Sequence, residues 1–308
     1  MDSTSPQSQA LVWLQDDPIT MTPGRSIRTA LERYVMAVLY YTTNGPSWNN
    51  HQLNRNDVCT WNEQISDDIP DTWTGVACSV SGGTIDSLSL WRNNLVGPVP
   101  WELVLLTDLK SIIFNDNRLS GSIPTRISEL STLETFVLRS NKLEGGLPAT
   151  ISPVTSVLDL SYNLLSGSLP DSWWASMPAL QKITLNVNKI TGSIPTSIGQ
   201  LQNMLSFQAA LNQLTGTLPT ELGLLTLLET LILESNYMTG SVPPELDQLS
   251  SLDELDIAWN SFFGSLNETV CGLSGLSFLR ADCGEVDCPC CTVCCDGARV
   301  EPCQEMTR

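Results

Sequence analysis

The sequence predicts an α/β solenoid, a right-handed curved stack of similar coils with a parallel β-sheet along its concave side. Eight asparagines recur at intervals of 22 to 25 residues, and each is followed four residues later by glycine. In seven of the eight repeats a proline stands three residues after that glycine. Such a period indicates a supersecondary unit that buries a core only when copies of it stack. The asparagines are Asn93, Asn117, Asn141, Asn163, Asn188, Asn212, Asn236 and Asn260.

Each part of the unit has a mechanical reason. The residues five and three positions before the asparagine are nearly always apolar, as Ile112 and Phe114 are, which predicts the inward face of a short strand. After the strand the chain turns where backbone amides lack neighbours, and a buried Asn side chain both donates and accepts there. Glycine allows a backbone conformation closed to other residues, and proline ends strand pairing. We therefore interpret these three positions as structural and expect the asparagines to stack as a ladder.

The segment around the repeat glycine resembles a known family. It reads SGSIP at 120–124, TGSIP at 191–195 and TGSVP at 239–243. This pattern is similar to the plant-type leucine-rich repeat of cell-surface receptor ectodomains and polygalacturonase-inhibiting proteins. The resemblance covers about residues 85–284, and it implies a leucine-rich-repeat solenoid.

The chain before the repeats resembles the cap of the same family. Cys59–Trp61 and Trp73–Cys78 are similar to the CxWxGVxC core of the plant-type N-terminal cap, split here by an insertion at Asn62–Thr72. Residues 5–18 and 33–50, like the CPCCTVCC tail, are similar to leucine-rich-repeat proteins of diatoms and other unicellular algae. The resemblance thus extends to both ends of the chain.

Hydrophobic periodicity predicts helices in this N-terminal cap. Apolar residues recur every three or four positions from Ile27 to Leu39, directly after Ser26, a residue type favoured at N-caps. Ser5 and Pro6 predict the start of a shorter helix. Together with the repeats, these signals divide the chain into a helical N-terminal cap (1–84), eight repeats (85–275) and a Cys-rich C-terminal cap (276–308). The last part is expected to open with a partial ninth strand at Leu279–Cys283.

All ten cysteines lie outside the regular repeats. Cys59 and Cys78 belong to the N-terminal cap, and the even total predicts one disulfide there and four in the tail, which need an oxidising compartment. The CxxC spacing of Cys288 and Cys291 also suits zinc, but vicinal cysteines and a tail without His favour disulfides, so we expect no metal. The tail cysteines are Cys271, Cys283, Cys288, Cys290, Cys291, Cys294, Cys295 and Cys303.

Charge and hydropathy exclude several partners. The net charge of −18, from 15 basic and 33 acidic residues, is spread along the chain, which argues against nucleic acid and anionic lipid. The longest apolar run, Tyr34–Tyr41, is too short to span a bilayer. No basic, apolar leader begins at Met1. Either a leader or anchor lies upstream or the protein is cytosolic; the cysteine pattern favours the first, so we expect an extracellular or cell-surface location.

One sequence motif predicts a glycosylation site, and the scarcity of catalytic groups argues against enzyme activity. Asn267-Glu268-Thr269 is the one N-x-[ST] sequence and takes the place of the proline in the eighth repeat, so Asn267 is a candidate glycosylation site. The only histidine is His51, which excludes Ser-His, Cys-His and multi-His sites. Glu254 and Asp256 form a carboxylate pair on an expected exposed strand without sign of a pocket. We expect no enzyme activity and no cofactor.

The outward positions of the concave sheet are the expected binding surface. Aromatic and arginine side chains there are of the types enriched in binding hot spots, and apolar ones add contact area. A protein or peptide ligand fits best, with a cell-wall glycan as a further ligand class. A secreted hydrolase inhibitor, like the polygalacturonase-inhibiting proteins, is the alternative. An ice-binding solenoid needs an outward column of Thr or Asn, which this sheet lacks. The candidate residues are Trp91, Arg92, Ile113, Arg139, Tyr162 and Trp259.

Overall fold

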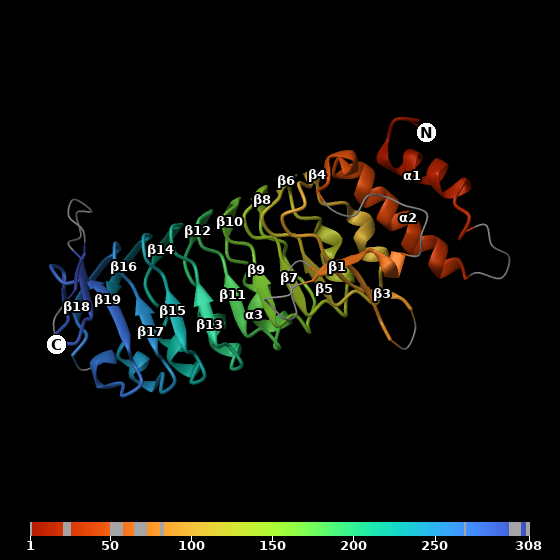
Figure 1. The fold of residues 1–308 in the computed structure, drawn as a ribbon. Helices are drawn as coiled ribbons and strands as arrows, with labels where there is room; N and C mark the ends of the chain where they lie inside the picture. The colour runs from red at the N-terminus through yellow and green to blue at the C-terminus, as the bar shows by residue number, and fades with distance from the viewer. Residues whose placement is uncertain are drawn as a thin grey trace. The chain divides into compact units, whose positions relative to one another are not determined.

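A computed structural model describes residues 2–20, 26–49, 58–64, 73–80, 83–267, 269–295 and 303–305. The chain forms two compact units, Met1–Thr155 and Ser156–Arg308, and each is described by itself. Both are built from one kind of coil, in which a short strand leads through the asparagine turn to a second short strand and then to a helical turn (Figure 1). The predicted solenoid is thus present in each unit.

The first unit begins with two helices, α1 (Pro6–Gln15) and α2 (Ile27–Thr42), which pack against each other (Figure 1). Both predicted helix starts are confirmed, because the side-chain oxygens of Ser5 and Ser26 accept backbone N–H groups of the first turn. The apolar contact between the helices consists of Ala10, Ala37 and Val38, with Trp13, Tyr34 and Tyr41 packed against it.

A buried ion pair ties the segment after α1 to α2. Arg33 donates from Nε to Asp17 Oδ2 at 2.6 Å, and both side chains are almost fully buried. The Thr20 hydroxyl donates to the same oxygen at 2.6 Å. Burial opposes ionisation of the carboxyl group, but the hydrogen bonds from Arg33 and Thr20 outweigh it and lower the pKa of Asp17.

The first sheet of this unit has an antiparallel start and a parallel continuation. Strand β2 (Trp73–Cys78) pairs antiparallel with β1 (Asn62–Gln64) and β3 (Ile85–Ser89). From β3 the pairing is parallel, through β5 (Ser111–Ile113) to β7 (Thr135–Val137). The insertion in the cap therefore opens as a strand, and its residues 65–72 lie outside the described part of the chain.

The second unit has the same first sheet, ordered along the chain and parallel except for its last strand, which pairs antiparallel. The predicted ninth strand is present as β19, and two further strands follow it that the sequence did not indicate. The strands are β9 (Val157–Asp159), β11 (Lys182–Thr184), β13 (Ser206–Gln208), β15 (Thr230–Ile232), β17 (Glu254–Asp256), β19 (Phe278–Asp282), β21 (Val293–Cys295) and β22 (Gln304–Glu305).

A second sheet, which the sequence did not predict, follows the asparagine turn in both units. Its strands are three to five residues long in most coils and pair in parallel. In the first unit they are β4 (Val96–Pro98), β6 (Arg118–Gly121) and β8 (Lys142–Gly146). In the second unit they are β10 (Leu164–Ser168), β12 (Lys189–Gly192), β14 (Gln213–Gly216), β16 (Tyr237–Ser241), β18 (Ser261–Ser265) and β20 (Val286–Asp287).

The repeat glycine lies within this second sheet at positive φ, as expected from its position. At Gly97 the φ is 121°, and a Cβ there would stand 2.4 Å from the carbonyl oxygen of Thr42 at the end of α2. The N–H of Val96 donates to the neighbouring carbonyl of Thr43 at 3.0 Å. Glycine therefore lets the first repeat approach the cap helix closely.

Helical turns form the remaining side of most coils and begin after the repeat proline, but the coil that follows Pro148, which the structure describes throughout, has no helical turn before β9 (Val157–Asp159). One of them is a short α-helix, α3 (Ser172–Ser176), whose Trp173 and Trp174 are buried in the core of the second unit. The others are 3-10 helices. They are η1 (Gly45–Ser47) and η2 (Val58–Thr60) in the cap, and η3 (Trp101–Leu105), η4 (Thr125–Glu129), η5 (Thr196–Gln200), η6 (Thr220–Leu224), η7 (Pro244–Gln248) and η8 (Val270–Gly272) in the repeats.

The asparagine ladder is present. Asn236, 4% exposed, donates through Nδ2 to the carbonyls of Ala209 and Leu233 at 2.9 Å each, and its Oδ1 accepts the N–H of Leu214 at 2.9 Å. The Asn236 side chain therefore bonds backbone of its own coil and of the preceding coil. The same set recurs at Asn117 in the first unit, where Oδ1 accepts two N–H groups.

The residue before each repeat asparagine adopts left-handed backbone, a feature without a sequence signal. The φ angles at these eight positions lie between 50° and 57°. Glycine, Asn and Asp tolerate this region, whereas a β-branched residue is strained there. The residues are Arg92, Asp116, Ser140, Tyr162, Val187, Leu211, Ser235 and Trp259.

The ladder ends in the second unit at a carboxylate. In the regular coils the N–H groups at the asparagine turn donate to carbonyls of the following coil, as Leu211 does to Glu234 at 2.9 Å. At the last turn, the N–H groups of Trp259 and Asn260 donate instead to Asp282 Oδ1 and Oδ2, at 2.9 and 3.0 Å. Burial raises the pKa of Asp282 although both hydrogen bonds favour the ionised form.

Replacing one ladder asparagine should destabilise the fold without changing its surface. We expect Asn236→Ala to lower the free energy of unfolding by about 1–3 kcal/mol, because it leaves buried backbone groups without partners. Gln213→Ala, at an exposed position of β14, is the matched control and should change it by less than about 0.5 kcal/mol. Urea unfolding followed by circular dichroism measures both, and equal effects would contradict the structural role of the ladder.

Candidate functional site

The first unit carries four of the six predicted binding residues at its strand face. Ile113 lies on β5 in register with Ser89 and Val137, and Trp91, Arg92 and Arg139 follow the ends of their strands. All four are at least partly exposed. Alternation thus predicted the accessibility of Trp91, Ile113 and Arg139 correctly, whereas Arg92, adjacent to Trp91, is exposed at a left-handed backbone position.

Arg92 connects an aromatic ring to a carboxylate. Its guanidinium lies 5.3 Å from the centroid of the Trp91 ring, within cation–π range. Its Nε is 3.5 Å from Asp116 Oδ2 on the neighbouring coil. The side chain is 70% exposed, so the ion pair adds little to stability. It does hold the guanidinium in one place on the surface.

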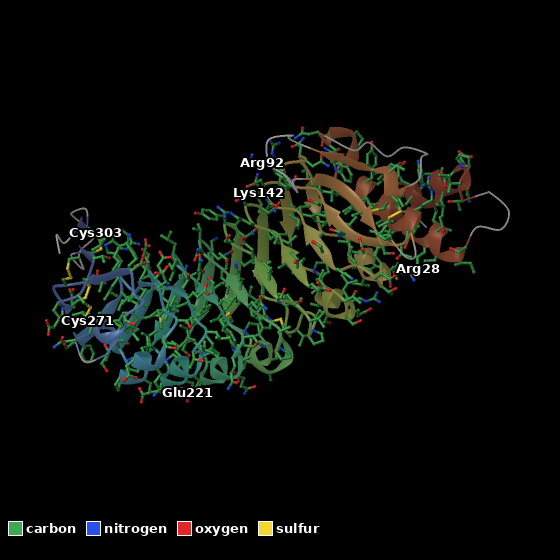
Figure 2. All side chains as sticks on the ribbon, turned by 60° about the horizontal axis from the view of Figure 1, so that its bottom comes forward. Arg28, Arg92, Lys142, Glu221, Cys271 and Cys303 are labelled. Atoms are coloured by element: carbon green, nitrogen blue, oxygen red, sulfur yellow. A yellow bond between two sulfur atoms is a disulfide. The ribbon has the colours of Figure 1, made fainter. Side chains whose placement is uncertain are left out.

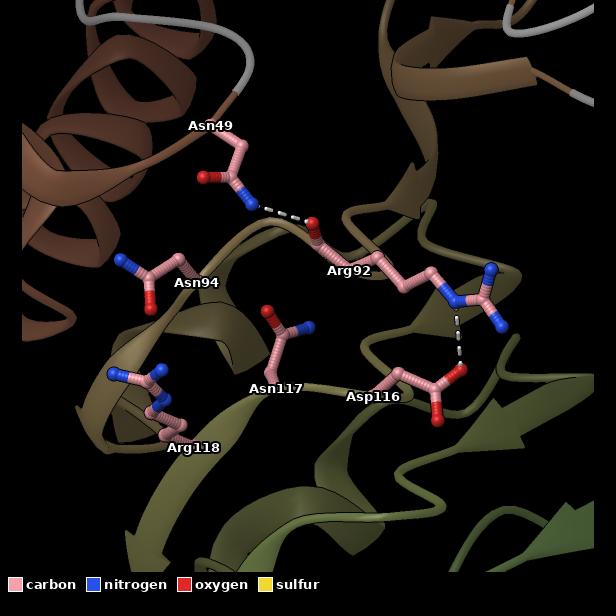
Figure 3. A pocket seen from close by; sticks show the side chains of 6 residues that line it. All are labelled: Asn49, Arg92, Asn94, Asp116, Asn117 and Arg118. Atoms are coloured by element: carbon pink, nitrogen blue, oxygen red, sulfur yellow. Dashed lines mark hydrogen bonds and ion pairs between the residues drawn. The ribbon is translucent and has the colours of Figure 1, made fainter.

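A polar hollow of about 380 Å³ adjoins this pair (Figure 3). The cap shapes one side of it, because Asn49 donates through Nδ2 to the carbonyl of Arg92 at 2.9 Å and Asn94 donates to the carbonyl of Ser47 at 2.8 Å. The lining holds two guanidinium groups and one carboxylate, in a chain of net charge −18. The lining residues are Asn49, Arg92, Asn94, Asp116, Asn117 and Arg118.

Arg118 gives the hollow its available donor. It is exposed, and the described residues offer its side chain no ion pair or hydrogen bond. Arg92, in contrast, is engaged by Asp116 on the far side of the hollow (Figure 3). A free guanidinium beside a paired one and three asparagine amides suits a ligand group that offers hydrogen-bond acceptors, such as a carboxylate or a carbonyl.

The second unit carries the other two predicted residues, and they lie apart. Tyr162 is 46% exposed after β9, whereas Trp259 follows β17. Three strands stand between β9 and β17, a separation of about 19 Å at the usual strand spacing. Tyr162 and Trp259 therefore do not share one contact patch.

Trp259 belongs to a charged cluster that corrects one expectation. Asp256, expected on an exposed strand, is 3% exposed and accepts a hydrogen bond from Arg280, which also pairs with Glu234. The Arg280 guanidinium lies 5.2 Å from the Trp259 ring centroid. Burial, together with the nearby charge of Asp256, raises the pKa of Glu254. The ninth strand supplies the arginine that neutralises these carboxylates.

The sequence identified only part of the site in the first unit. Asp116 and Arg118 stand at the turn and just after it, at positions whose orientation depends on the left-handed backbone and on the second sheet. Asn49 comes from the cap, which no repeat register places. His51, the only histidine, lies outside the described part of the chain.

All ten cysteines are paired in the structure. Cys59–Cys78 closes the N-terminal cap, and the sulfurs of the tail are visible as yellow sticks in Figure 2. Two groups of three tail sulfurs lie within 4.8 Å of one another, but each sulfur belongs to a disulfide, and metals bind the thiolate. The tail pairs are Cys271–Cys290, Cys283–Cys294, Cys288–Cys291 and Cys295–Cys303.

Known proteins share this architecture. A family model described as Leucine Rich Repeat matches residues 155–175, which contain β9, the asparagine turn and β10. The plant peptide hormone receptor RGFR1, in complex with RGF2, is 31% identical over 64% of this chain and 32% of its own, with a TM-score of 0.62. The chain has the leucine-rich-repeat solenoid fold and is similar to plant leucine-rich-repeat ectodomains.

Two further structures resemble this leucine-rich-repeat chain. The ectodomain of the Arabidopsis receptor kinase HAESA, in complex with an extended IDA peptide hormone, is 26% identical over 72% of this chain and 42% of its own, with a TM-score of 0.61. A plant ice-binding protein is 24% identical over 85% of this chain and 88% of its own, with a TM-score of 0.63. The last likeness shows the fold alone.

The leucine-rich-repeat chain spans about a third of the first receptor's length and less than half of the second's. No curated protein sequence matches it. Within the described residues, no helix combines the length and apolarity needed to cross a bilayer. The resemblance to plant leucine-rich-repeat ectodomains that was predicted from the repeat motif is confirmed.

The state of the tail cysteines can be measured directly. We expect mass spectrometry of the native protein, alkylated without reduction, to find no free thiols, and a chelator to leave the melting temperature unchanged. Disulfide-bonded cysteines do not bind a metal, so a chelator removes nothing on which the stability of the fold depends. Stoichiometric zinc in the purified protein, together with free tail thiols, would contradict the disulfide assignment.

Proposed function

We propose that the strand face of the first unit binds an extended peptide or an exposed segment of a protein, as a recognition module without catalytic activity. The observation that carries this proposal is the Trp91–Arg92–Asp116 arrangement beside the polar hollow. It combines an aromatic surface, a positioned charge and a concave polar site within one unit. Tryptophan and arginine together supply much of the affinity in protein interfaces.

The chemistry of an extended peptide matches these parts. Its backbone carbonyls and acidic groups accept hydrogen bonds, which the free guanidinium of Arg118 donates. Its apolar side chains find half-buried Ile113 and Val137 on the sheet between the charged positions. Arg92 is held between a ring and a carboxylate before any ligand arrives, which lowers the entropy lost on binding.

The comparisons support a peptide more than a glycan. The receptors RGFR1 and HAESA were both solved with peptide hormones bound, and no relative described above is named for a cell-wall glycan. Five disulfides favour an oxidising compartment, and with it the extracellular or cell-surface location expected from the sequence.

Two tryptophans of the first unit provide a matched test of the binding face. Trp91 and Trp101 each lie near an arginine, at 5.3 and 4.5 Å, but Trp101 is on η3 rather than at the strand face. Linear peptides selected from a displayed library on the immobilised protein serve as the probe. We expect Trp91→Ala to weaken their binding by about 1–2 kcal/mol, roughly 5- to 30-fold, and Trp101→Ala to leave it unchanged.

The opposite result would place the ligand elsewhere. If selected peptides tolerate Trp91→Ala and Arg118→Ala but lose binding to Trp101→Ala, the strand face is not the recognition surface. Should no peptide be enriched while a secreted hydrolase is retained and inhibited, the alternative of a hydrolase inhibitor replaces the peptide-binding proposal. Melting temperatures of both tryptophan variants establish that folding is retained.

A second candidate function, binding of ordered water or ice, is favoured by the second sheet of the second unit. The first sheet lacks the required column of Thr or Asn, but the second sheet places hydroxyls in register on two pairs of neighbouring strands, with Gln213 opposite Thr191 and Tyr237 opposite Thr215 between them. Ser168 pairs with Thr191, and Thr239 pairs with Ser261. The exposed or half-exposed hydroxyl residues on its strands are Ser166, Ser168, Thr191, Thr215, Thr239, Ser241, Ser261 and Ser265.

Thermal hysteresis tests this candidate. If the hydroxyl face binds ice, the protein depresses the freezing point below the melting point, and Thr191→Lys reduces the gap because a bulky charge interrupts the surface. Thr184→Lys, on the first sheet, is the control and leaves the gap unchanged. Absence of hysteresis in the unmodified protein, measured in a nanolitre osmometer, excludes ice binding.

A further inference from the structure

The eighth repeat departs from the others on its helical side. Asn267 stands where seven repeats have proline, three residues before η8 begins at Val270. Both the N–H and the hydroxyl of Thr269 donate to the carbonyl of Leu266, at 3.2 and 3.0 Å. Thr269 is buried, while Asn267 is exposed.

A hollow of about 420 Å³ lies beside Asn267, between η7 and η8. Its volume is within the range of small-molecule sites. Asp247 on η7 and Leu273 after η8 face it from opposite elements. The space at Gly272 is open, since a Cβ at that position would meet nothing within 4 Å. The lining residues are Asp247, Asn267, Thr269, Gly272 and Leu273.

We propose that Asn267 carries an N-linked glycan and that its first N-acetylhexosamine lies in this hollow. The Asn-x-Thr sequence is the acceptor for this modification, and Asn267 is accessible. The proposal goes beyond peptide recognition and does not depend on it. The bond formed joins the Asn267 amide nitrogen to the sugar C1, with the lipid-linked oligosaccharide as donor and its pyrophosphate as leaving group.

The lining matches the chemistry of an N-acetylated sugar. The exposed Asp247 carboxylate accepts hydrogen bonds from sugar hydroxyls or from the acetamido N–H. Leu273, half-buried, offers an apolar surface to the acetyl methyl group. Such a contact removes apolar surface of the leucine side chain from water, and the hydrophobic effect therefore favours a sugar bound in the hollow.

The neighbouring disulfide points to the same compartment. Cys271–Cys290 joins η8 to the tail, one residue before Gly272. Disulfides persist along the secretory route, where Asn-x-Thr sequences are also glycosylated. None of the lining residues lies on a strand of the first sheet. A glycan in the hollow therefore leaves the strand face of this unit uncovered.

The modification is tested on the full chain, secreted from a eukaryotic host and isolated from its native source. We expect the Asn267 peptide to carry one glycan that peptide N-glycosidase removes, leaving Asp at this position. Asn267→Gln loses the glycan mass, whereas Thr269→Ser retains it. Because Asn267 is exposed, Asn267→Gln also keeps the melting temperature of the enzymatically deglycosylated protein. Unmodified Asn267 in the native protein would overturn the proposal.

The seat of the first sugar has a separate readout. If the hollow holds it, the glycosidase releases the glycan from the folded protein several-fold faster in Leu273→Ala and Asp247→Ala than in the unmodified sequence. The three proteins show equal rates after denaturation. Equal rates in the folded state would mean that the glycan points into solvent, which contradicts the hollow as its binding site while leaving the modification itself established.

Discussion

The bidentate use of one buried side chain, the repeat asparagine, sets the geometry on which the rest of each unit depends. Its amide nitrogen satisfies carbonyls of two coils, and its oxygen satisfies an N–H of the preceding coil. Because both partners are backbone, the contact does not depend on neighbouring side chains. It holds the turn closed, and the strands of the two sheets lie on either side of that turn.

The repeat structure was predictable because the same pattern appears eight times in the sequence, which chance matches to the pattern do not produce. The second sheet was not, since strands such as β6 (Arg118–Gly121) are too short to show alternation of their own. The outward position of Trp91 follows from alternation and is confirmed, whereas Asp256, at another outward position, is buried in its ion pair with Arg280. The hollow beside Trp91 was missed because Asn49 reaches it from the cap, and a tertiary contact of that kind leaves no periodic signal.

Both ends of a repeat array expose backbone groups that the next coil normally satisfies, and this chain treats its two ends differently. At the start, the carbonyl of Thr43 beyond α2 accepts the N–H of Val96, and Gly97 permits the close approach. At the end, no following coil supplies carbonyls to the last turn, and the two carboxylate oxygens of Asp282 accept its N–H groups instead. The disulfide Cys283–Cys294 fixes the strand that carries Asp282. A carboxylate suits this last position because it accepts without needing to donate.

The residue before each repeat asparagine has a fixed left-handed backbone conformation but no fixed side-chain type. Its backbone is dictated by the ladder, so arginine, aspartate, tyrosine, valine, leucine and tryptophan all occupy the same conformation, and only one of them, Asp116, is a type that favours it. The other types accept local strain that the surrounding coil absorbs. The side chains of this row can therefore change one residue at a time. The scaffold that positions them depends on a different set of residues, the asparagines. Substitutions at the left-handed positions therefore change the side chains that the surface presents, while the asparagines keep the structure of the coil unchanged.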